Sequence, residues 1–272
     1  MRASLLQIAV DPDEAVPSRR RRVASMVRGQ RGADLVVLPE LWTVGAFAHD
    51  SFAAEAEPVD GPTCRAMAEA AGDAGVWLHA GSIVERAAAG SPGDADALYN
   101  TSLVFSPDGE LVRTYRKIHR FGFDTGEAVM MAAGHELVTV PLPDLPFGVA
   151  TCYDLRFPEQ FRGLVDAGAL AFVVPAGWPA RRREHWSLLT RARAVENQAY
   201  VLACGTGGTH AGVEQAGHSV VVDPWGEVLA EAGTGEEILT VELDPARVAA
   251  TRERFPALKD RRLGVPAPSA RR

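Results

Sequence analysis

The stretch FGVATCYDLRFPEQFRGLVDAGALAFVV, residues 147–174, contains a complete strand–helix–strand pattern. Its two ends, 147–151 and 170–174, are short apolar runs rich in Val, Leu, Phe and Ala, as buried strands are. The segment between them predicts a helix over 158–167, whose first two residues, Pro and Glu, suit a first helical turn. Strands that alternate with helices in this way indicate an α/β fold.

The same alternation continues along the chain. Further apolar runs predict strands at 4–10, 35–38, 76–84, 98–105, 111–115, 199–204, 219–222 and 238–243. Helices are expected near 19–31, 62–74 and 184–198. No Pro/Ser-rich linker or composition break divides the chain, so we expect a single domain over residues 1–272, with a disordered tail at about 263–272.

A weak internal repeat adds to this picture. Residues 103–112 (LVFSPDGELV) and 220–229 (VVVDPWGEVL) share a strand, a Pro-x-Gly-Glu turn and a second strand. Likewise, LVVLPE at 35–40 is similar to FVVPAG at 172–177. Two similar halves that each bury one sheet face predict two sheets packed against each other, with helices on the outside.

Composition limits the classes of function. The 272 residues are 47% hydrophobic and 23% charged, which is typical of a globular protein and excludes a disordered or collagen-like chain. The net charge of −7 has the wrong sign for a nucleic-acid partner. No apolar run reaches the roughly 20 residues of a membrane span, so no membrane partner is expected. Three cysteines and no secretory signal favour the reducing cytoplasm.

Cys152 is the first candidate for chemistry, because it lies between an apolar strand and a predicted helix. Amides at such a turn lower the pKa of a thiol and can bind an oxyanion. A lone cysteine is more often a small buried hydrophobic residue, and this interpretation is kept for Cys64 and Cys204.

Two charged residues follow other predicted strands. Glu40 ends the run DLVVLPE, where partial burial would raise the pKa of a carboxylate toward that of a general base. Lys117 follows the strand at 111–115 and is one of only two lysines among 28 basic residues, the other being Lys259. A lysine in such an arginine-rich chain suggests a need for a compact ammonium group. The glycine-rich loop after it contains Glu127.

Other catalytic signatures are missing from the sequence. The seven histidines show no metal-ligand spacing, so neither a metal nor another cofactor is expected. There is no G-x-S-x-G elbow, P-loop or G-x-G-x-x-G motif, and GTGGTH at 205–210 is more typical of a turn than of a phosphate site.

Several motifs together resemble the nitrilase superfamily of carbon–nitrogen hydrolases. The similarity runs over nearly the whole chain and rests on VVLPE (36–40), YRKIH (115–119), ATCYDLRFPE (150–159), VPAGWPARRREHW (174–186), RARAVENQAYV (191–201), DPWGEVL (223–229) and FPALKDRR (255–262). The resemblance implies an α-β-β-α sandwich that forms homodimers or larger homo-oligomers through its outer helices. It also implies a Glu–Lys–Cys triad, which maps onto Glu40, Lys117 and Cys152, and a second glutamate at Glu127.

This resemblance predicts amide hydrolysis through a cysteine thioester. Cys152 would attack the carbonyl, Glu40 would act as general base and acid, and Lys117 with the backbone amide of Tyr153 would bind the oxyanion. The motifs are most similar to omega-amidases and deaminated glutathione amidases, which implies a small amide substrate. Trp178, Arg182 and His185 are candidate substrate-binding residues, with Arg182 placed to bind a carboxylate.

Departures from the family pattern leave the exact amide open. ACGTGG at 203–208 and RFGFDTGE at 120–127 differ from the usual relatives, and either segment could border the substrate. The alternatives are a nitrilase that uses the same triad on a nitrile, and a catalytically silent binding member of the family. A papain-like hydrolase would instead need a histidine base, for which His119 is the candidate.

Overall fold

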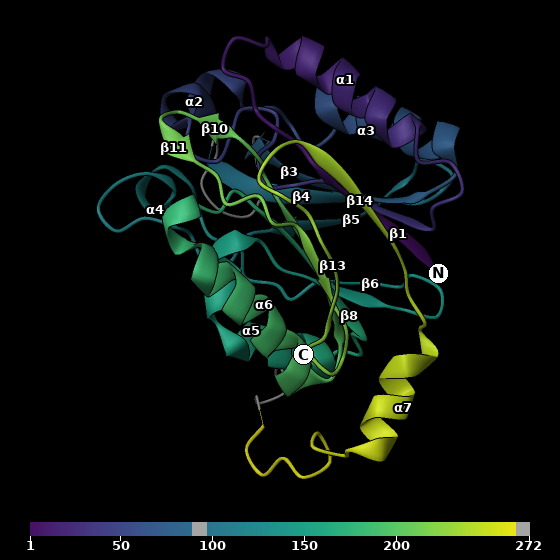
Figure 1. Ribbon diagram of the computed structural model, residues 1–272. Coiled ribbons are helices and arrows are strands. Elements are labelled where there is room, and N and C mark those ends of the chain that lie inside the picture. Colours follow the sequence, from purple (N-terminus) through teal and green to yellow (C-terminus); the bar gives the residue numbers. More distant parts are fainter. Residues whose placement is uncertain (89–96, 265–272) are drawn as a thin grey trace.

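Two six-stranded sheets form the middle of the molecule in the computed structural model, which describes residues 1–88 and 97–264. The strand order is β14-β1-β2-β3-β4-β5 in the first sheet and β13-β12-β9-β8-β7-β6 in the second. Helices cover the outer face of each sheet (Figure 1). The predicted four-layer α-β-β-α sandwich is therefore confirmed.

The first sheet contains β1 (Arg2–Gln7), β2 (Leu35–Val37), β3 (Trp77–Arg86), β4 (Leu98–Phe105), β5 (Leu111–Arg116) and β14 (Glu237–Glu242). The second contains β6 (Thr139–Val140), β7 (Phe147–Val149), β8 (Ala171–Ala176), β9 (Tyr200–Gly205), β12 (Val220–Val222) and β13 (Val228–Glu231). A separate small hairpin pairs β10 (Thr209–His210) with β11 (Val213–Glu214).

The α-helices are α1 (Val16–Arg28), α2 (Phe52–Glu55), α3 (Pro62–Ala74), α4 (Glu127–Met130), α5 (Pro158–Asp166), α6 (Arg183–Asn197) and α7 (Ala246–Arg254). Helix α1 begins three residues before the expected start at 19, because Pro17 fits the first turn of a helix. Short 3-10 helices span His49–Ser51, Cys152–Arg156 and Ala180–Arg182.

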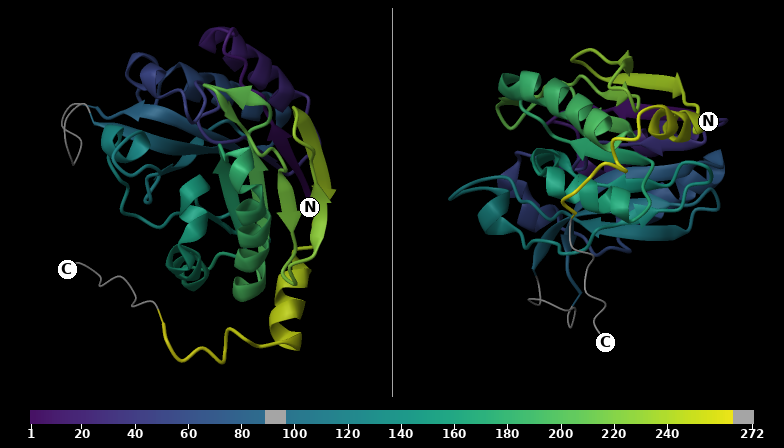
Figure 2. Two further views of the ribbon diagram at one scale, coloured as in Figure 1. Left: turned by 60° about the vertical axis from the view of Figure 1, so that its left-hand side comes forward. Right: turned by 90° about the horizontal axis from the view of Figure 1, so that it is seen from below.

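Three apolar layers hold the sandwich together. Helices α1 and α3 pack on the first sheet, and α5 and α6 pack on the second (Figures 1 and 2). Between the sheets lie side chains from both, including Leu5, Val37, Val149, Val173 and Leu202. Because β2, β7, β8 and β9 have neighbours on both faces, they carry the uninterrupted apolar runs visible in the sequence.

The internal repeat corresponds to one hairpin in each sheet. Strands β4 and β5 pair through the turn at 106–110, and β12 and β13 pair through the turn at 223–227. In each turn the glycine has positive φ, 78° at Gly109 and 80° at Gly226, which explains why glycine occupies both positions. The expected packing of two similar halves is thus observed.

After α7 the chain runs back beneath α5 and α6 (Figures 1 and 2), where Arg261 forms an ion pair with Asp166 of α5. The disordered tail was expected at 263–272. Leu263 and Gly264 belong to no helix or strand, and 265–272 lie outside the described residues. Within the described ranges, no helix combines the length and apolarity needed to cross a bilayer.

Candidate active site

Glu40 lies just beyond β2 and is 2% exposed. Its Oε1 atom accepts hydrogen bonds from Lys117 Nζ and Asn100 Nδ2, both at 2.8 Å. Its Oε2 atom accepts one from the backbone amide of Gly177, also at 2.8 Å, which follows β8 in the other sheet. The carboxylate therefore joins the ends of two strands from different sheets, and three donors orient it.

Lys117 directly follows the last residue of β5 and is 2% exposed. Besides Glu40, its ammonium group donates to Glu127 Oε2 at 2.7 Å. Burial alone would lower the pKa of Lys117, but the charges of Glu127 and Glu40 outweigh it and raise the pKa well above its ordinary value. Lys117 is therefore a fixed positive charge between two buried carboxylates.

Asn100 links the two carboxylates and was not anticipated from the sequence. Its Nδ2 donates to Glu40 at 2.8 Å and to Glu127 Oε1 at 2.9 Å. The only available signal was an amide side chain in the polar part of strand β4 (Asn100, Thr101 and Ser102), where a buried polar residue is usually bonded to another buried group. Glu127, at the start of α4, also accepts the Phe121 amide at 2.7 Å.

Cys152 begins the 3-10 helix that follows β7, and its φ of 48° lies in the left-handed region. Such a backbone conformation is strained for a residue with a Cβ atom. Thr151 and Asp154 hold it through a reciprocal capping box. The thiol is buried, with Sγ 3.8 Å from the Gly177 carbonyl oxygen.

The expectation of a lowered thiol pKa is wrong in this structure. Burial and the charge of Glu40 raise the pKa of Cys152 well above its ordinary value, and the charge of Lys117 only partly opposes them. Helix α5, whose amides were expected to act on the thiol, begins six residues later, at Pro158. The resting sulfur is therefore a protonated thiol that needs a base to become a nucleophile.

Glu40 is the candidate for that base, because both side chains reach the same residue: Glu40 Oε2 accepts the Gly177 amide at 2.8 Å, and Cys152 Sγ lies 3.8 Å from the Gly177 carbonyl oxygen. The alternative base, His119, instead directs its Nδ1 atom to Asp154 at 2.8 Å. This arrangement disfavours the papain-like mechanism.

A small cavity of about 20 Å³ opens beside Cys152. It is lined by Phe47, Phe121, Cys152, Tyr153, Arg156, Gly177, Trp178, Pro179 and Arg182. Phe121 belongs to the unusual loop at 120–127, so that departure from the family pattern does border the cavity. None of the lining residues comes from the other unusual segment, 203–208.

Two arginines border this cavity. The Arg182 guanidinium lies 5.3 Å from the Phe121 ring centre, and that of Arg156 lies 5.0 Å from the Trp178 ring centre. Neither arginine forms an ion pair within the described part of the chain, and Arg182 Nη1 is buried without a hydrogen-bond partner there. Burial and the neighbouring charges of Arg181 and Arg156 lower the pKa of Arg182. A bound anion at this position would accept a hydrogen bond from Arg182 and offset the repulsion between the neighbouring arginines.

The structure thus brings Tyr153, Trp178 and Arg182 to the cavity but not His185. His185 is exposed, and its Nδ1 atom lies 3.2 Å from Arg156 Nη2, so it meets the site only through Arg156. Arg156 was overlooked in the sequence, although it lies in the same motif as Cys152.

Comparison with known proteins agrees with this geometry. The model of the carbon–nitrogen hydrolase family matches residues 2–253. The chain belongs to the carbon–nitrogen hydrolase family. Among its carbon–nitrogen hydrolase relatives is a 2-oxoglutaramate amidase of Paenarthrobacter nicotinovorans, 40% identical over 96% of this chain and 89% of the relative. The mouse omega-amidase NIT2 is 35% identical over 96% of this chain and 95% of its own.

A solved carbon–nitrogen hydrolase has the same fold. Saccharomyces cerevisiae Nit3, described as a member of branch 10 of the nitrilase superfamily, superposes with a TM-score of 0.84 at 33% identity and 97% coverage of both chains.

Proposed function

We propose that this carbon–nitrogen hydrolase is an amidase that converts the terminal carboxamide of a short dicarboxylate to a carboxylate and ammonia. The observation that carries the proposal is the buried cluster of Cys152, Glu40 and Lys117 at the base of a cavity bordered by two arginines.

Acylation follows from the positions of these three side chains. Glu40 takes the thiol proton of Cys152, and the sulfur forms a bond to the carbonyl carbon of the amide. Negative charge develops on the carbonyl oxygen, where Lys117 Nζ and the Tyr153 amide stabilise it. Glu40 then gives the proton to the nitrogen, the carbon–nitrogen bond breaks, and ammonia leaves behind a thioester.

Deacylation repeats the same steps with water. Glu40 takes a proton from water, the resulting hydroxide attacks the thioester carbon, and the carbon–sulfur bond breaks. The proton held by Glu40 returns to the Cys152 sulfur, and the product leaves as a carboxylic acid that gives its remaining proton to ammonia or water to become the carboxylate. Glu127 and Asn100 keep Lys117 and Glu40 in place throughout, because they hydrogen-bond these two groups and neither of them gains or loses a proton in these steps.

The size and charge of the cavity favour a slender acidic amide. The cavity has a volume of only about 20 Å³, so a substrate must be slender, and with its carboxamide at Cys152 its other end would lie by the two arginines that line the same cavity. A guanidinium group binds a carboxylate through two hydrogen bonds. The name of the Paenarthrobacter nicotinovorans relative makes 2-oxoglutaramate the first compound to test.

Ammonia release from a panel of amides tests this proposal. We expect turnover of 2-oxoglutaramate and related monoamides, slower turnover of uncharged amides of equal length, and no release from the corresponding nitriles. Preference for nitriles would favour a nitrilase, and no turnover of any compound would favour a silent binding protein.

Arg182→Ala tests carboxylate recognition. Loss of a charge-assisted bond of about 1.5–3 kcal/mol raises KM for the acidic amide by roughly tenfold to a hundredfold. An uncharged amide keeps its KM. The exposed neighbour Arg181 is the matched control, and Arg181→Ala should leave both values unchanged. Equal losses on both substrates would contradict a role for Arg182 in binding the acid group.

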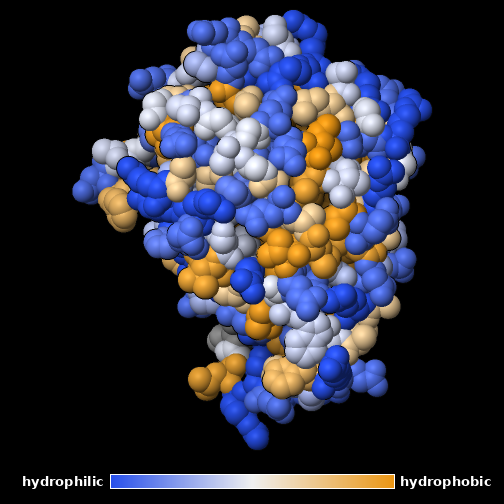
Figure 3. All heavy atoms as spheres, in the orientation of Figure 1, coloured by the Kyte–Doolittle hydropathy of each residue, from blue (hydrophilic) through white to orange (hydrophobic). Residues whose placement is uncertain are grey.

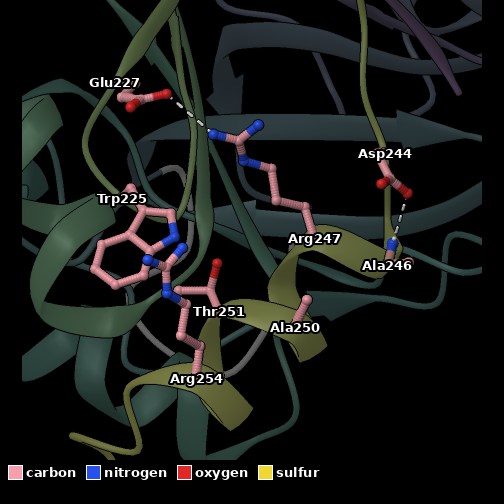
Figure 4. Close-up of a pocket in the computed structure, with 8 residues that line it drawn as sticks. All are labelled: Trp225, Glu227, Asp244, Ala246, Arg247, Ala250, Thr251 and Arg254. Carbon is pink, nitrogen blue, oxygen red and sulfur yellow. Dashed lines mark hydrogen bonds and ion pairs between the residues drawn. The ribbon is translucent and has the colours of Figure 1, made fainter.

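We further propose that the protein is a homodimer or larger homo-oligomer in the cytoplasm. Exposed apolar side chains gather over α6 and β13 (Figure 3), with Leu188 66% and Val195 52% exposed on α6. Beside them, Arg254 lies over the Trp225 ring in a hollow of about 560 Å³ (Figure 4), which shares no lining residue with the cavity at Cys152. Covering these apolar side chains would remove them from water.

Light scattering during gel filtration tests this assembly. The wild-type protein should elute with the mass of a dimer or larger species, and Leu188→Glu with Val195→Glu should lower that mass. A wild-type monomer would contradict the proposal. The cytoplasmic assignment is supported by three buried cysteines that form no disulfide, and cell fractionation tests it.

A further inference from the structure

Asp154 belongs to the 3-10 helix that Cys152 begins, and it is 0% exposed. Its Oδ2 atom accepts the Thr151 amide at 2.8 Å and the Tyr115 hydroxyl at 2.6 Å. Its Oδ1 atom accepts the His119 amide at 2.9 Å and lies 2.8 Å from His119 Nδ1. Four contacts fill the acceptor capacity of one carboxylate.

The Tyr115 contact has a defined direction. Its hydroxyl oxygen already accepts hydrogen bonds from the Ile118 amide at 3.2 Å and from Gln160 Nε2 at 2.8 Å. Its own hydrogen is therefore directed to Asp154. Burial and the charge of Asp154 raise the pKa of Tyr115 well above its ordinary value, so this donor stays protonated.

On one side, Asp154 holds the nucleophile. Cys152 has a positive φ, a conformation that is unfavourable for a residue with a side chain. Thr151 immediately precedes Cys152 and forms two hydrogen bonds with Asp154. The Asp154 carboxylate accepts the Thr151 backbone amide, and the Thr151 side chain accepts the Asp154 backbone amide. Without this carboxylate, the strained turn would lose the contacts that oppose its relaxation.

On the other side, Asp154 holds the lysine. Tyr115 and His119 lie two residues before and two residues after Lys117, and both are bonded to the same carboxylate. The strand end that carries the ammonium group is therefore tied at two points to the turn that carries the thiol.

We propose that Asp154 is a positioning residue that fixes the separation of Lys117 Nζ from Cys152 Sγ. The inference deepens the proposed amidase function and rests on it for the effect on turnover. In a buried site the energy between two charges depends steeply on their distance, because little water screens them. Loosening Asp154 therefore weakens the stabilisation that Lys117 gives to the thiolate and to the oxyanion.

The test uses Asp154→Asn, which keeps the shape and one acceptor oxygen but places an amide group against hydrogen-bond donors. We expect kcat to fall at least tenfold with KM within threefold, because Asp154 does not line the cavity. The alkylation profile, which is the rate of Cys152 alkylation by iodoacetamide as a function of pH, should shift to higher pH. Alkylation needs no amide, so it tests Asp154 even if the wild-type protein hydrolyses none of the compounds tried.

Asp223→Asn is the matched control. Asp223 is 0% exposed and accepts the backbone amides of Trp225 and Glu227, both at 2.9 Å, in the β12–β13 turn. This variant should lose stability but keep the alkylation profile and kcat of the wild-type protein. The proposal is overturned if Asp154→Asn shows the wild-type alkylation profile, whether or not it loses stability.

Tyr115→Phe keeps the test decisive if Asp154→Asn does not fold. It removes only one donor to the carboxylate, so a smaller shift of the alkylation profile in the same direction is expected. An unchanged profile in folded Tyr115→Phe protein would then overturn the proposal.

Discussion

Asn100 offers a sharp test of the buried cluster, because among the described residues only its amide group and Lys117 are hydrogen-bonded to both Glu40 and Glu127. We consider Asn100→Leu, which has a similar shape but no hydrogen-bond donor. The substitution leaves each carboxylate with two other donors. Glu40 keeps Lys117 and Gly177, and Glu127 keeps Lys117 and a backbone amide.

The magnitude follows from the two hydrogen bonds removed. Each is a bond to a charged acceptor in a site excluded from water and contributes about 1.5–3 kcal/mol. The sum is about 3–6 kcal/mol. Because leucine adds apolar contacts and the other donors remain, we expect a loss near 3 kcal/mol in the free energy of unfolding. Glu40 becomes less well oriented, so kcat should fall roughly tenfold to a hundredfold.

Urea unfolding followed by circular dichroism measures the stability, and ammonia release measures kcat. Thr101→Val is the matched control on the same strand, β4. Thr101 Oγ1 donates to Glu85 at 2.5 Å, so the control also loses one bond to a buried carboxylate, outside the cluster. It should lose stability and keep the wild-type kcat.

An Asn100→Leu protein as active as the Thr101→Val control would refute the reasoning. It would mean that Glu40 is oriented by Lys117 and Gly177 alone. An Asn100→Leu protein as stable as the wild type would show that the two hydrogen bonds contribute little net free energy.

Four other expectations can be measured directly. Cys152→Ala should fold and release no ammonia, whereas Cys64→Ala should keep near wild-type activity; turnover by the first variant would exclude a covalent thioester. Lys117→Arg should lose at least a hundredfold in kcat, because the longer planar cation cannot occupy the position of the ammonium group, and an active variant would contradict this. Activity should persist in a chelator, since the thiol and carboxylate mechanism uses no metal; rescue of a chelated sample by a divalent ion would argue otherwise. Burial lowers the pKa of His79 from 6.5 to about 3, so the unfolded chain takes up a proton below pH 6.5 that the folded chain refuses. The free energy of unfolding should therefore fall by about 1.4 kcal/mol per pH unit between pH 6.5 and about 3, and His79→Asn should flatten this part of the curve in urea titrations; an equally steep fall in the variant would count against it.

The sequence by itself determined the layers of the fold. Apolar runs such as 147–149 and 171–176 are continuous because those strands are covered on both faces, and the Pro-x-Gly-Glu turns mark a hairpin in each sheet. It also indicated Glu40, Lys117 and Cys152, because each stands where a strand ends and a charged or nucleophilic side chain is unusual.

Only the tertiary structure decided how these residues act. Glu40 belongs to the first sheet and Gly177 to the second, so their hydrogen bond depends on how the sheets face each other, which no local pattern records. The same holds for Asn100 and Asp154, whose partners lie far away along the chain. The upward shift of the Cys152 pKa was missed for this reason. It depends on burial of the thiol and on the carboxylate of Glu40, which follows a strand of the other sheet, and the two come together only when the sheets pack.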